Sequence, residues 1–303
     1  MKSFTLDLPA NYRLHDVLAF HSRDTESVAE QVSDTRLRKG VVLDGVAVIL
    51  DIALAPTSAS CTVLADGKLS QAAQQRVRDA AISILGLRID PEPFCAFAAR
   101  DDMFGPLTVA QPGLRIVQSA TVFEALTWAI IGQQINLPFA ISLRRTFILQ
   151  AGRQHSSGLW CYPEAADAIK LSMDDLTSRK FSRAKAETLL RLANLVASGD
   201  LRLDVSPTNS IEQISAALLA VKGIGPWTVN YGLLRGYGYA DCSLHGDVAI
   251  RAALQQLLGE DVKPDMPRTE QILARYAPHR TMAAAHLWAS LHPPGDQQDE
   301  DSP

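Results

Sequence analysis

Hydrophobic and polar positions follow two different periods along this chain, and the change of period divides it. Near the N-terminus the period is two, as in Phe4-Thr5-Leu6-Asp7-Leu8, which predicts a strand because successive side chains of a strand point to opposite faces. Further β-rich runs predict strands at 27–33, 40–43, 46–54 and 60–65, and helical spacing appears at 13–22 and 71–85. We therefore expect residues 1–112 to form an α+β domain with an antiparallel sheet.

From residue 113 to residue 292, apolar side chains recur every three or four positions, which predicts helices throughout. The clearest helical runs are 122–131, 137–149, 183–197, 211–221, 227–234 and 248–258. Two prolines fall within 106–113, so this segment is predicted to be a linker. Residues 293–303 are acidic and lack an apolar pattern, and we expect them to be disordered.

Composition excludes several classes of protein. With 303 residues and 47% hydrophobic side chains the chain can bury a sizeable core. No apolar run approaches the roughly 20 residues that span a bilayer, and the N-terminus lacks the apolar centre of a signal peptide, so we expect a cytoplasmic protein with no membrane partner. Four cysteines lie far apart and form no C-x-x-C pair, which argues against zinc, iron–sulfur and disulfide frameworks: Cys61, Cys95, Cys161 and Cys242.

The net charge of −4 does not by itself suggest nucleic acid. Acidic residues outnumber basic ones in 1–112 and in the C-terminal tail, whereas basic residues are in slight excess over 113–292. This distribution is compatible with a protein that touches a short stretch of DNA rather than one that wraps it.

The segment Lys222-Gly223-Ile224-Gly225-Pro226-Trp227 lies between two predicted helices. The first glycine allows a tight turn, the second lets another backbone or ligand come close, and Pro226 fits the first turn of a helix. Amide groups at the start of that helix have no partner within it and can hold an anion such as a nucleic-acid phosphate. An ordinary turn between two helices remains the structural alternative.

Two further features follow the hairpin, one on its second helix and one at the start of the next predicted helix. Trp227 and Tyr231 are one helical turn apart and share a face, which suits a buried core or a wall on which a flipped base stacks. Asp247 stands immediately before an apolar helical run, where it can be a helix N-cap. The same carboxylate, placed beside a cleft, could stabilise a cationic transition state.

The hairpin, the Trp227–Tyr231 helix and an Asp about twenty residues later resemble the helix-hairpin-helix DNA glycosylase superfamily, and more narrowly DNA-3-methyladenine glycosylase II. Other stretches fall in the family's order, and the resemblance extends over about residues 3–292: Phe123-Glu124-Ala125, Ile131-Gly132-Gln133-Gln134 and His286-Leu287-Trp288. It implies that residues 113–292, which follow the N-terminal α+β domain of 1–112, form a mainly helical core of two lobes with a cleft between them.

The resemblance also implies a function, namely base-excision repair of double-stranded DNA. Such an enzyme flips a damaged nucleotide out of the duplex and hydrolyses the N-glycosidic bond of an alkylated base of the 3-methyladenine type. Asp247 matches the family's catalytic Asp and would stabilise an oxocarbenium-like sugar. Trp227, Tyr231 and Phe20 match pocket positions and would stack on the electron-poor base.

For DNA binding, the resemblance implies that the hairpin holds a phosphate through Gly223, Ile224, Gly225 and Thr228. The backbone carbonyls of Leu219, Val221 and Ile224 would bind a bridging cation, Na⁺, K⁺ or Mg²⁺. No other cofactor is expected, and we expect a monomer that acts on the nucleoid. The apolar wedge of the family falls at Gln134, with the adjacent Ile135 as the alternative.

Three departures from the family pattern shape the expectation. Trp227 stands where lyase members carry a Lys, which predicts a monofunctional hydrolase without lyase activity. His279 replaces an expected pocket Trp and Val248 an expected Tyr, so deaminated, oxidised or etheno bases remain open as substrates. A non-catalytic protein that binds damaged DNA is the alternative of another class, with Asp247 acting only as a cap.

The remaining conspicuous side chains are interpreted structurally. We expect Trp128, Trp160 and Trp288 to be core residues, with Trp128 able to border the pocket. The basic pairs Arg144-Arg145 and Arg179-Lys180 are expected on solvated faces, where phosphate contacts are the alternative.

Overall fold

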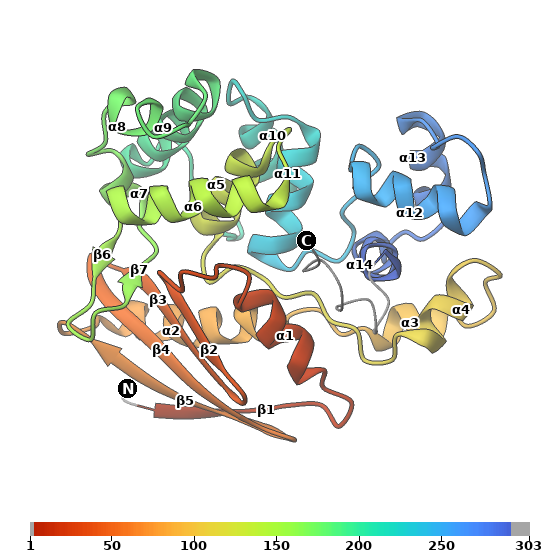
Figure 1. The fold of residues 1–303 in the computed structure, drawn as a ribbon, viewed down its shortest axis with the longest axis horizontal. Coiled ribbons are helices and arrows are strands. Elements are labelled where there is room, and N and C mark those ends of the chain that lie inside the picture. Colours follow the sequence, from red (N-terminus) through yellow and green to blue (C-terminus); the bar gives the residue numbers. More distant parts are fainter. Residues whose placement is uncertain (1–2, 292–303) are drawn as a thin grey trace, which may run out of the picture. The chain divides into compact units, whose positions relative to one another are not determined.

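An antiparallel sheet and two groups of helices make up the computed structural model, which describes residues 3–291 (Figure 1). The five-stranded sheet has the order β1-β5-β4-β3-β2 and every neighbouring pair is antiparallel. Its strands are β1 (Ser3–Asp7), β2 (Glu30–Ser33), β3 (Arg36–Leu43), β4 (Val46–Ala55) and β5 (Ser58–Ala65). The predicted α+β class with an antiparallel N-terminal sheet is confirmed.

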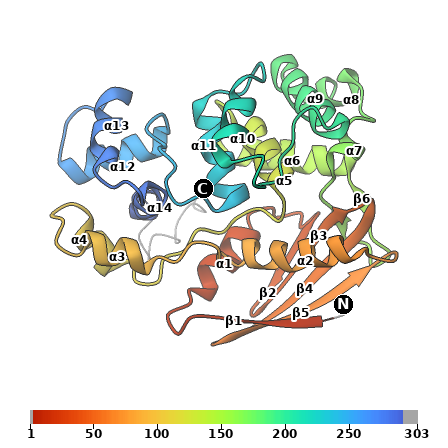
Figure 2. The ribbon, with the colours of Figure 1, turned by 180° about the vertical axis from the view of Figure 1, so that it is seen from behind.

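Both faces of the sheet are covered. Figure 2 shows α1 (Leu14–His21) and α2 (Gln71–Ile84) beside the sheet, and their apolar side chains join the core formed by one of its faces. A short hairpin of β6 (Arg153–Gln154) and β7 (Trp160–Cys161) packs through Cys161 against the other face. Gly40 of β3 makes this approach possible, because a Cβ there would lie 2.1 Å from the carbonyl oxygen of Trp160.

The chain divides into two compact units that each combine separate segments. The first unit comprises Met1–Arg88 and Val117–Tyr237, and so joins the sheet to the first group of helices. These helices are α5 (Val122–Gly132), α6 (Leu137–Ala151), α7 (Ala165–Ala168), α8 (Met173–Thr177), α9 (Arg183–Ser198), α10 (Ile211–Leu219) and α11 (Pro226–Gly232), followed by a π-helical turn at Leu233–Tyr237. Helix α5 is central, because it contacts α6, α9 and α11, and its side chains are apolar except for the buried Glu124 and Thr127.

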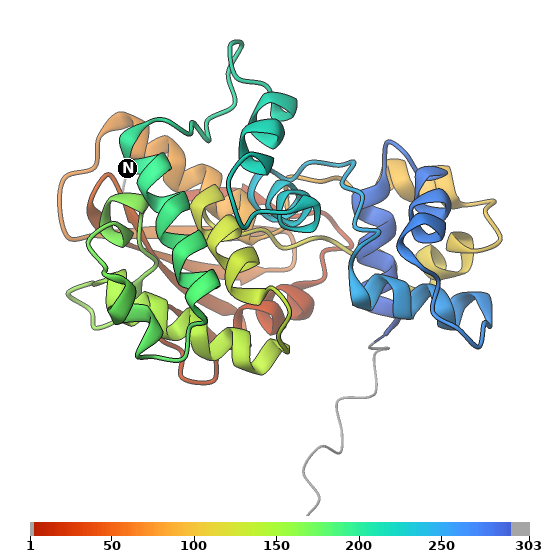
Figure 3. The same cartoon turned by 90° about the horizontal axis from the view of Figure 1, so that it is seen from above.

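The second unit comprises Ile89–Ile116 and the chain from Gly238 onward. Figure 3 shows its helices α3 and α4 (yellow) among the C-terminal helices (blue), and α4 contacts α14 although about 170 positions separate them in the sequence. The helices are α3 (Glu92–Ala98), α4 (Phe104–Ala110), α12 (Val248–Leu258), α13 (Met266–Ala274) and α14 (Arg280–Ser290).

One predicted element is wrong. The expected linker at 106–113 is largely helix α4, whose first turn accommodates Pro106 because its missing N–H has no acceptor there. Phe104 is fully buried against Tyr276, at 4.3 Å between ring centroids, which anchors this helix in the second unit. The predicted domain boundaries, 1–112 and 113–292, remain a prediction. The predicted acidic tail at 293–303 lies outside the described residues.

Within residues 3–291 the structure contains no helix both long and apolar enough to cross a membrane. The same residues contain no group of three or more His, Cys, Asp or Glu side chains that could hold a metal ion. All four cysteines are free thiols, and three of them are buried.

Candidate DNA-binding and active site

The predicted hairpin joins α10 to α11. A capping box of Ser210 and Gln213 starts α10, and the turn that follows places Ile224 in the core with 5% of its surface exposed. Gly223 adopts a left-handed φ of +98°, and a Cβ at this position would lie 2.0 Å from Oγ1 of Thr188. Gly223 is therefore required by the fold itself.

Gly225 differs from Gly223 in both conformation and surroundings. It is the N-cap of α11 with φ −105°, and a Cβ at this position would meet no atom within 4 Å. Nothing in the first unit therefore demands a glycine here. A close approach by something outside the chain, as the predicted phosphate contact requires, would account for it.

A glutamine that we had not assigned connects the hairpin to the loop of the predicted wedge. Nε2 of Gln133 donates to the carbonyl oxygen of Gly223 (3.1 Å) and to Oγ1 of the buried Thr228 (2.9 Å). The signal was present in the Gly132-Gln133-Gln134 stretch, but the sequence does not show which glutamine faces the protein. Gln134, the predicted wedge, is exposed with φ +55°, and Ile135 is half-buried.

Lys185 fixes the same loop from the other side. Its ammonium group, on a side chain that is only 9% exposed, donates to the carbonyl oxygens of Ile130, Ile131 and Gln133 at the end of α5. Burial lowers the pKa of Lys185 to about 8. The hairpin, Gln133 and the end of α5 thus form one hydrogen-bonded group within the first unit.

The predicted aromatic wall is present in the first unit. The rings of Trp227 and Tyr231 stack with centroids 5.1 Å apart and an interplanar angle of 30°. Nε1 of Trp128 donates to the Tyr231 hydroxyl (3.1 Å). Trp128 therefore lies beside the wall, which agrees with the alternative interpretation of this residue as one that borders the pocket. Phe20, on α1, is linked to Tyr231 through Arg235, whose guanidinium lies 4.9 Å from the Phe20 ring and 5.6 Å from the Tyr231 ring.

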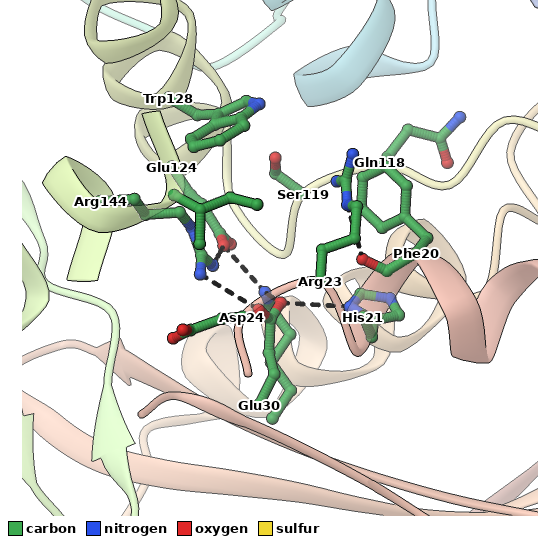
Figure 4. A pocket seen from close by; sticks show the side chains of 12 residues that line it. Phe20, His21, Arg23, Asp24, Glu30, Gln118, Ser119, Glu124, Trp128 and Arg144 are labelled. Atoms are coloured by element: carbon green, nitrogen blue, oxygen red, sulfur yellow. Dashed lines mark hydrogen bonds and ion pairs between the residues drawn. The ribbon is translucent and has the colours of Figure 1, made fainter. Parts of the chain in front are cut away.

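A small cavity opens between Phe20, Trp128 and Arg144, all in the first unit (Figure 4). Its volume of about 40 Å³ accommodates a few water molecules. Its floor is a buried network in which Lys39 contacts Glu30 (2.5 Å) and Glu124 (2.8 Å). Arg144 contacts the same two carboxylates at 3.1 and 2.8 Å.

The cations of this network lower the pKa values of its two glutamates, and its arginine corrects the prediction made for Arg144-Arg145. Burial alone would raise the pKa of Glu30, but Arg144 and Lys39 outweigh it and hold that pKa well below its usual range. The pKa of Glu124 is likewise lowered, with burial opposed by Lys39 and Arg144. The prediction of a solvated face at Arg144-Arg145 is wrong, because the Arg144 side chain is only 11% exposed and Arg145 pairs with Asp24 at 2.5 Å.

In the second unit, Asp247 is the N-cap of α12, which is one of the two roles that the sequence suggested for it. Its Oδ1 accepts from the amides of Ala249 and Ile250, both at 3.0 Å, and from Nε1 of Trp288 at 3.2 Å. Trp288 is half-buried and oriented toward this carboxylate, so its expected role as a plain core residue is wrong. Cap geometry gives the carboxylate a fixed position at a helix end and excludes neither predicted role.

The two residues that depart from the family pattern also lie in the second unit. Val248 follows Asp247 and has 65% of its surface exposed. His279 precedes α14 and contacts the rings of Phe97 (5.6 Å between centroids) and Phe94 (6.4 Å). His279 therefore lies between a buried ring, Phe94, and an exposed one, Phe97, although the residue itself is not the expected Trp.

No protein-family model matches the chain. In sequence it is 31% identical over 179 residues to "Putative DNA-3-methyladenine glycosylase YfjP" of Bacillus subtilis, a match that covers 59% of this chain and 62% of that relative. It is 29% identical over 206 residues to the "DNA-3-methyladenine glycosylase" of the same organism, covering 67% and 68%. The chain thus spans somewhat under two thirds of the first of these relatives and just over two thirds of the second.

In structure the chain resembles "3-methyladenine dna-glycosylase from Archaeoglobus fulgidus" with a TM-score of 0.78 and 21% identity, over 94% of this chain and 97% of that one. It also resembles the 8-oxoguanine glycosylase/lyase of Clostridium acetobutylicum in complex with DNA, with a TM-score of 0.72 and 14% identity, over 95% and 94%. At these identities the likeness establishes the fold alone.

Proposed function

We propose that this chain, a relative of the DNA-3-methyladenine glycosylases with the helix-hairpin-helix glycosylase fold, excises alkylated bases from double-stranded DNA. The observation that supports this most directly is the combination of the hairpin, built as a rigid turn, with the stacked Trp227–Tyr231 wall on the helix that follows it. A generic helical protein needs neither an open glycine at Gly225 nor a stacked, half-buried aromatic pair beside it.

Each part of the proposal has a chemical reason. An N3- or N7-alkylated purine is cationic and already a good leaving group, so the enzyme must chiefly stabilise positive charge that develops on the sugar. We assign this role to Asp247, whose carboxylate is held at the start of α12 by two amides and the Trp288 indole. Because the hydrogen bonds orient it, the carboxylate needs no rearrangement as the charge develops.

We assign substrate binding to the remaining predicted residues. Trp227, Tyr231 and Phe20 of the first unit would stack on the flipped base, and Val248 and His279 of the second unit would contact the nucleotide. The amides of Gly223, Gly225 and Thr228 would bind a phosphate beside the lesion, with Ile224 between the two glycines, and a Na⁺, K⁺ or Mg²⁺ ion would lie on the carbonyls of Leu219, Val221 and Ile224. Gln134 would fill the gap in the stack, with Ile135 beside it.

We further propose a monofunctional hydrolase that works as a monomer on chromosomal DNA in the cytoplasm. Trp227 stands at the position where a lyase needs an amine, and the buried Lys185 has its ammonium bonded to three carbonyl oxygens of α5 and its C-cap. Both observations support a mechanism without a Schiff base.

The test is release of free base from DNA treated with a methylating agent. We expect 3-methyladenine and 7-methylguanine in the soluble fraction and an intact strand at each abasic site until alkali is added. Failure to release either base contradicts the glycosylase proposal. Capture of the protein on abasic DNA by borohydride contradicts the monofunctional mechanism.

A further inference from the structure

The turn that follows α5 directs two neighbouring glutamines to different surroundings. Gln133 is hydrogen-bonded to the hairpin through Gly223 and Thr228, whereas Gln134 is exposed. Gln134 also has a left-handed φ of +55°, which a residue with a side chain adopts at a cost and keeps only where its surroundings hold it. Another part of the protein must therefore fix this turn.

Lys185, in the first turn of α9, fixes it. Its ammonium group donates to the carbonyl oxygens of Ile131 (2.8 Å), Ile130 (3.3 Å) and Gln133. These carbonyls belong to the last turn of α5 and to its C-cap, where a helix has carbonyl groups without amide partners. An ammonium has three N–H donors and is attracted to the negative end of a helix dipole. This one group therefore closes the end of α5 and holds the turn.

Packing alone does not explain a charge at Lys185. The residue is only 9% exposed, and burial is what lowers the pKa of its ammonium. Among residues 3–291 no carboxylate forms an ion pair with it to offset the cost of burying that charge. An apolar side chain could fill the same space without this cost, so the ammonium points to a requirement other than packing.

The following turns of α9 support the hairpin in the same way. Nη1 of Arg191 donates to the carbonyl oxygen of Lys222 at 2.9 Å, and Thr188 occupies the space beside Gly223. One helix thus holds both the hairpin that would bind a phosphate and the turn that carries Gln134. The distance between these two parts of the proposed DNA-binding surface is set inside the first unit.

We propose that Lys185 is a positioning residue for base flipping, because it holds Gln134 where that side chain can fill the gap left by the flipped nucleotide. The inference rests on the proposed glycosylase function and adds a residue that acts before the N-glycosidic bond breaks. Flipping costs the pairing and stacking of the target nucleotide. A side chain that enters the stack offsets part of this cost, and it does so best when the protein already holds it in place.

A role in flipping can be separated from a role in stability by the base opposite the lesion. The cost of flipping is greatest for a well-paired base and smaller for a mismatched one. Bond cleavage, which we assign to Asp247, is the same step in both cases. The excision rate should therefore depend on Lys185 more strongly when the lesion is paired, whereas a merely structural Lys185 would affect both duplexes equally.

The experiment measures single-turnover release of 7-methylguanine at saturating protein, from duplexes that place the lesion opposite cytosine or opposite a mismatched adenine. Lys185→Met keeps an unbranched chain and removes the charge and its donors. It should lower the rate opposite cytosine at least about 10-fold and the rate opposite adenine less than about 3-fold. Lys185→Gln, which keeps a donor without the charge, should show the same selectivity to a smaller degree and replaces the Met variant if that variant does not fold. Lys68→Met, at an exposed lysine between β5 and α2, is the matched control and should leave both rates unchanged.

A spectroscopic signal reports flipping directly. A 2-aminopurine next to the lesion brightens when the stack opens, and this rise should appear with the wild type and be lost with Lys185→Met. A loss confined to the cytosine duplex, together with the lost fluorescence rise, supports the inference. An equal loss on both duplexes, no loss on either, or a rise as large as that of the wild type overturns it and leaves the proposed function standing. Release of 7-methylguanine from neither duplex by the wild type overturns the proposed function itself.

Discussion

The two glycines of the hairpin should respond in opposite ways to the same substitution. Gly223→Ala places a methyl group 2.0 Å from Oγ1 and 2.8 Å from Cγ2 of Thr188, on a backbone with φ +98°. Gly225→Ala places the same group in open space at φ −105°. The pair therefore separates the demands of the fold from those of a ligand.

The expected magnitudes follow from this geometry. At Gly223, a non-glycine residue in the left-handed region costs about 1–3 kcal/mol, and displacement of Thr188 costs about 1–3 kcal/mol more. The free energy of unfolding should therefore fall by about 2–6 kcal/mol. At Gly225, only the modest preference for glycine over alanine at an N-cap is lost, which is about 1 kcal/mol or less. Adding Thr188→Ala to Gly223→Ala should recover about 1–2 kcal/mol, because it removes the two clashing atoms.

The assay pairs urea unfolding, followed by tryptophan fluorescence, with binding of a fluorescent duplex that contains an abasic-site analogue. Gly225→Ala should unfold almost like the wild type and yet bind at least about 10-fold more weakly, because its methyl group occupies the space that a phosphate would enter. Wild-type affinity in Gly225→Ala would refute the reasoning that this glycine serves an approaching phosphate. Wild-type stability in Gly223→Ala would refute the packing argument.

Three further outcomes are expected. Lys39→Met should destabilise the first unit by about 3–5 kcal/mol in urea unfolding, because it leaves Glu30 and Glu124 buried with one cation fewer; a change under about 1 kcal/mol would contradict this. Because the folded-state pKa values of both glutamates are lowered, stability should be complete above about pH 4.5 and fall as pH drops further, and Glu124→Gln should flatten that fall. Gln133→Leu should weaken DNA binding and cost about 1–3 kcal/mol, since the buried hydroxyl of Thr228 loses a donor, whereas Gln134→Leu at the exposed neighbour should cost little stability.

Local signals in the sequence predicted much of this fold. The run at 248–258 is bounded by Asp247 as N-cap and by Gly259 in the left-handed conformation, so α12 begins and ends where short-range chemistry requires. The helix at Phe104–Ala110 was missed because its stability comes from the Phe104–Tyr276 contact, which joins positions far apart in the sequence. Proline content alone could not reveal that contact.

In the candidate site, too, features set by local sequence could be predicted, whereas contacts between distant segments could not. The hairpin and the Trp227–Tyr231 face follow from spacing along one helix, which sequence reasoning handles well. The partners of Arg144 on β2 and α5, and the indole that Trp288 directs at Asp247 from 41 positions away, depend on the tertiary fold.

The central claim is that a carboxylate at Asp247 drives base excision, and Asp247→Asn tests it most directly. Asparagine is as good an N-cap as aspartate and can accept the same bonds from Ala249, Ile250 and Trp288, so stability and DNA affinity should stay close to wild type. The account predicts that single-turnover release of 7-methylguanine falls on the order of 10²–10³-fold in this variant. Release at the wild-type rate would contradict it and leave Asp247 as a helix cap alone.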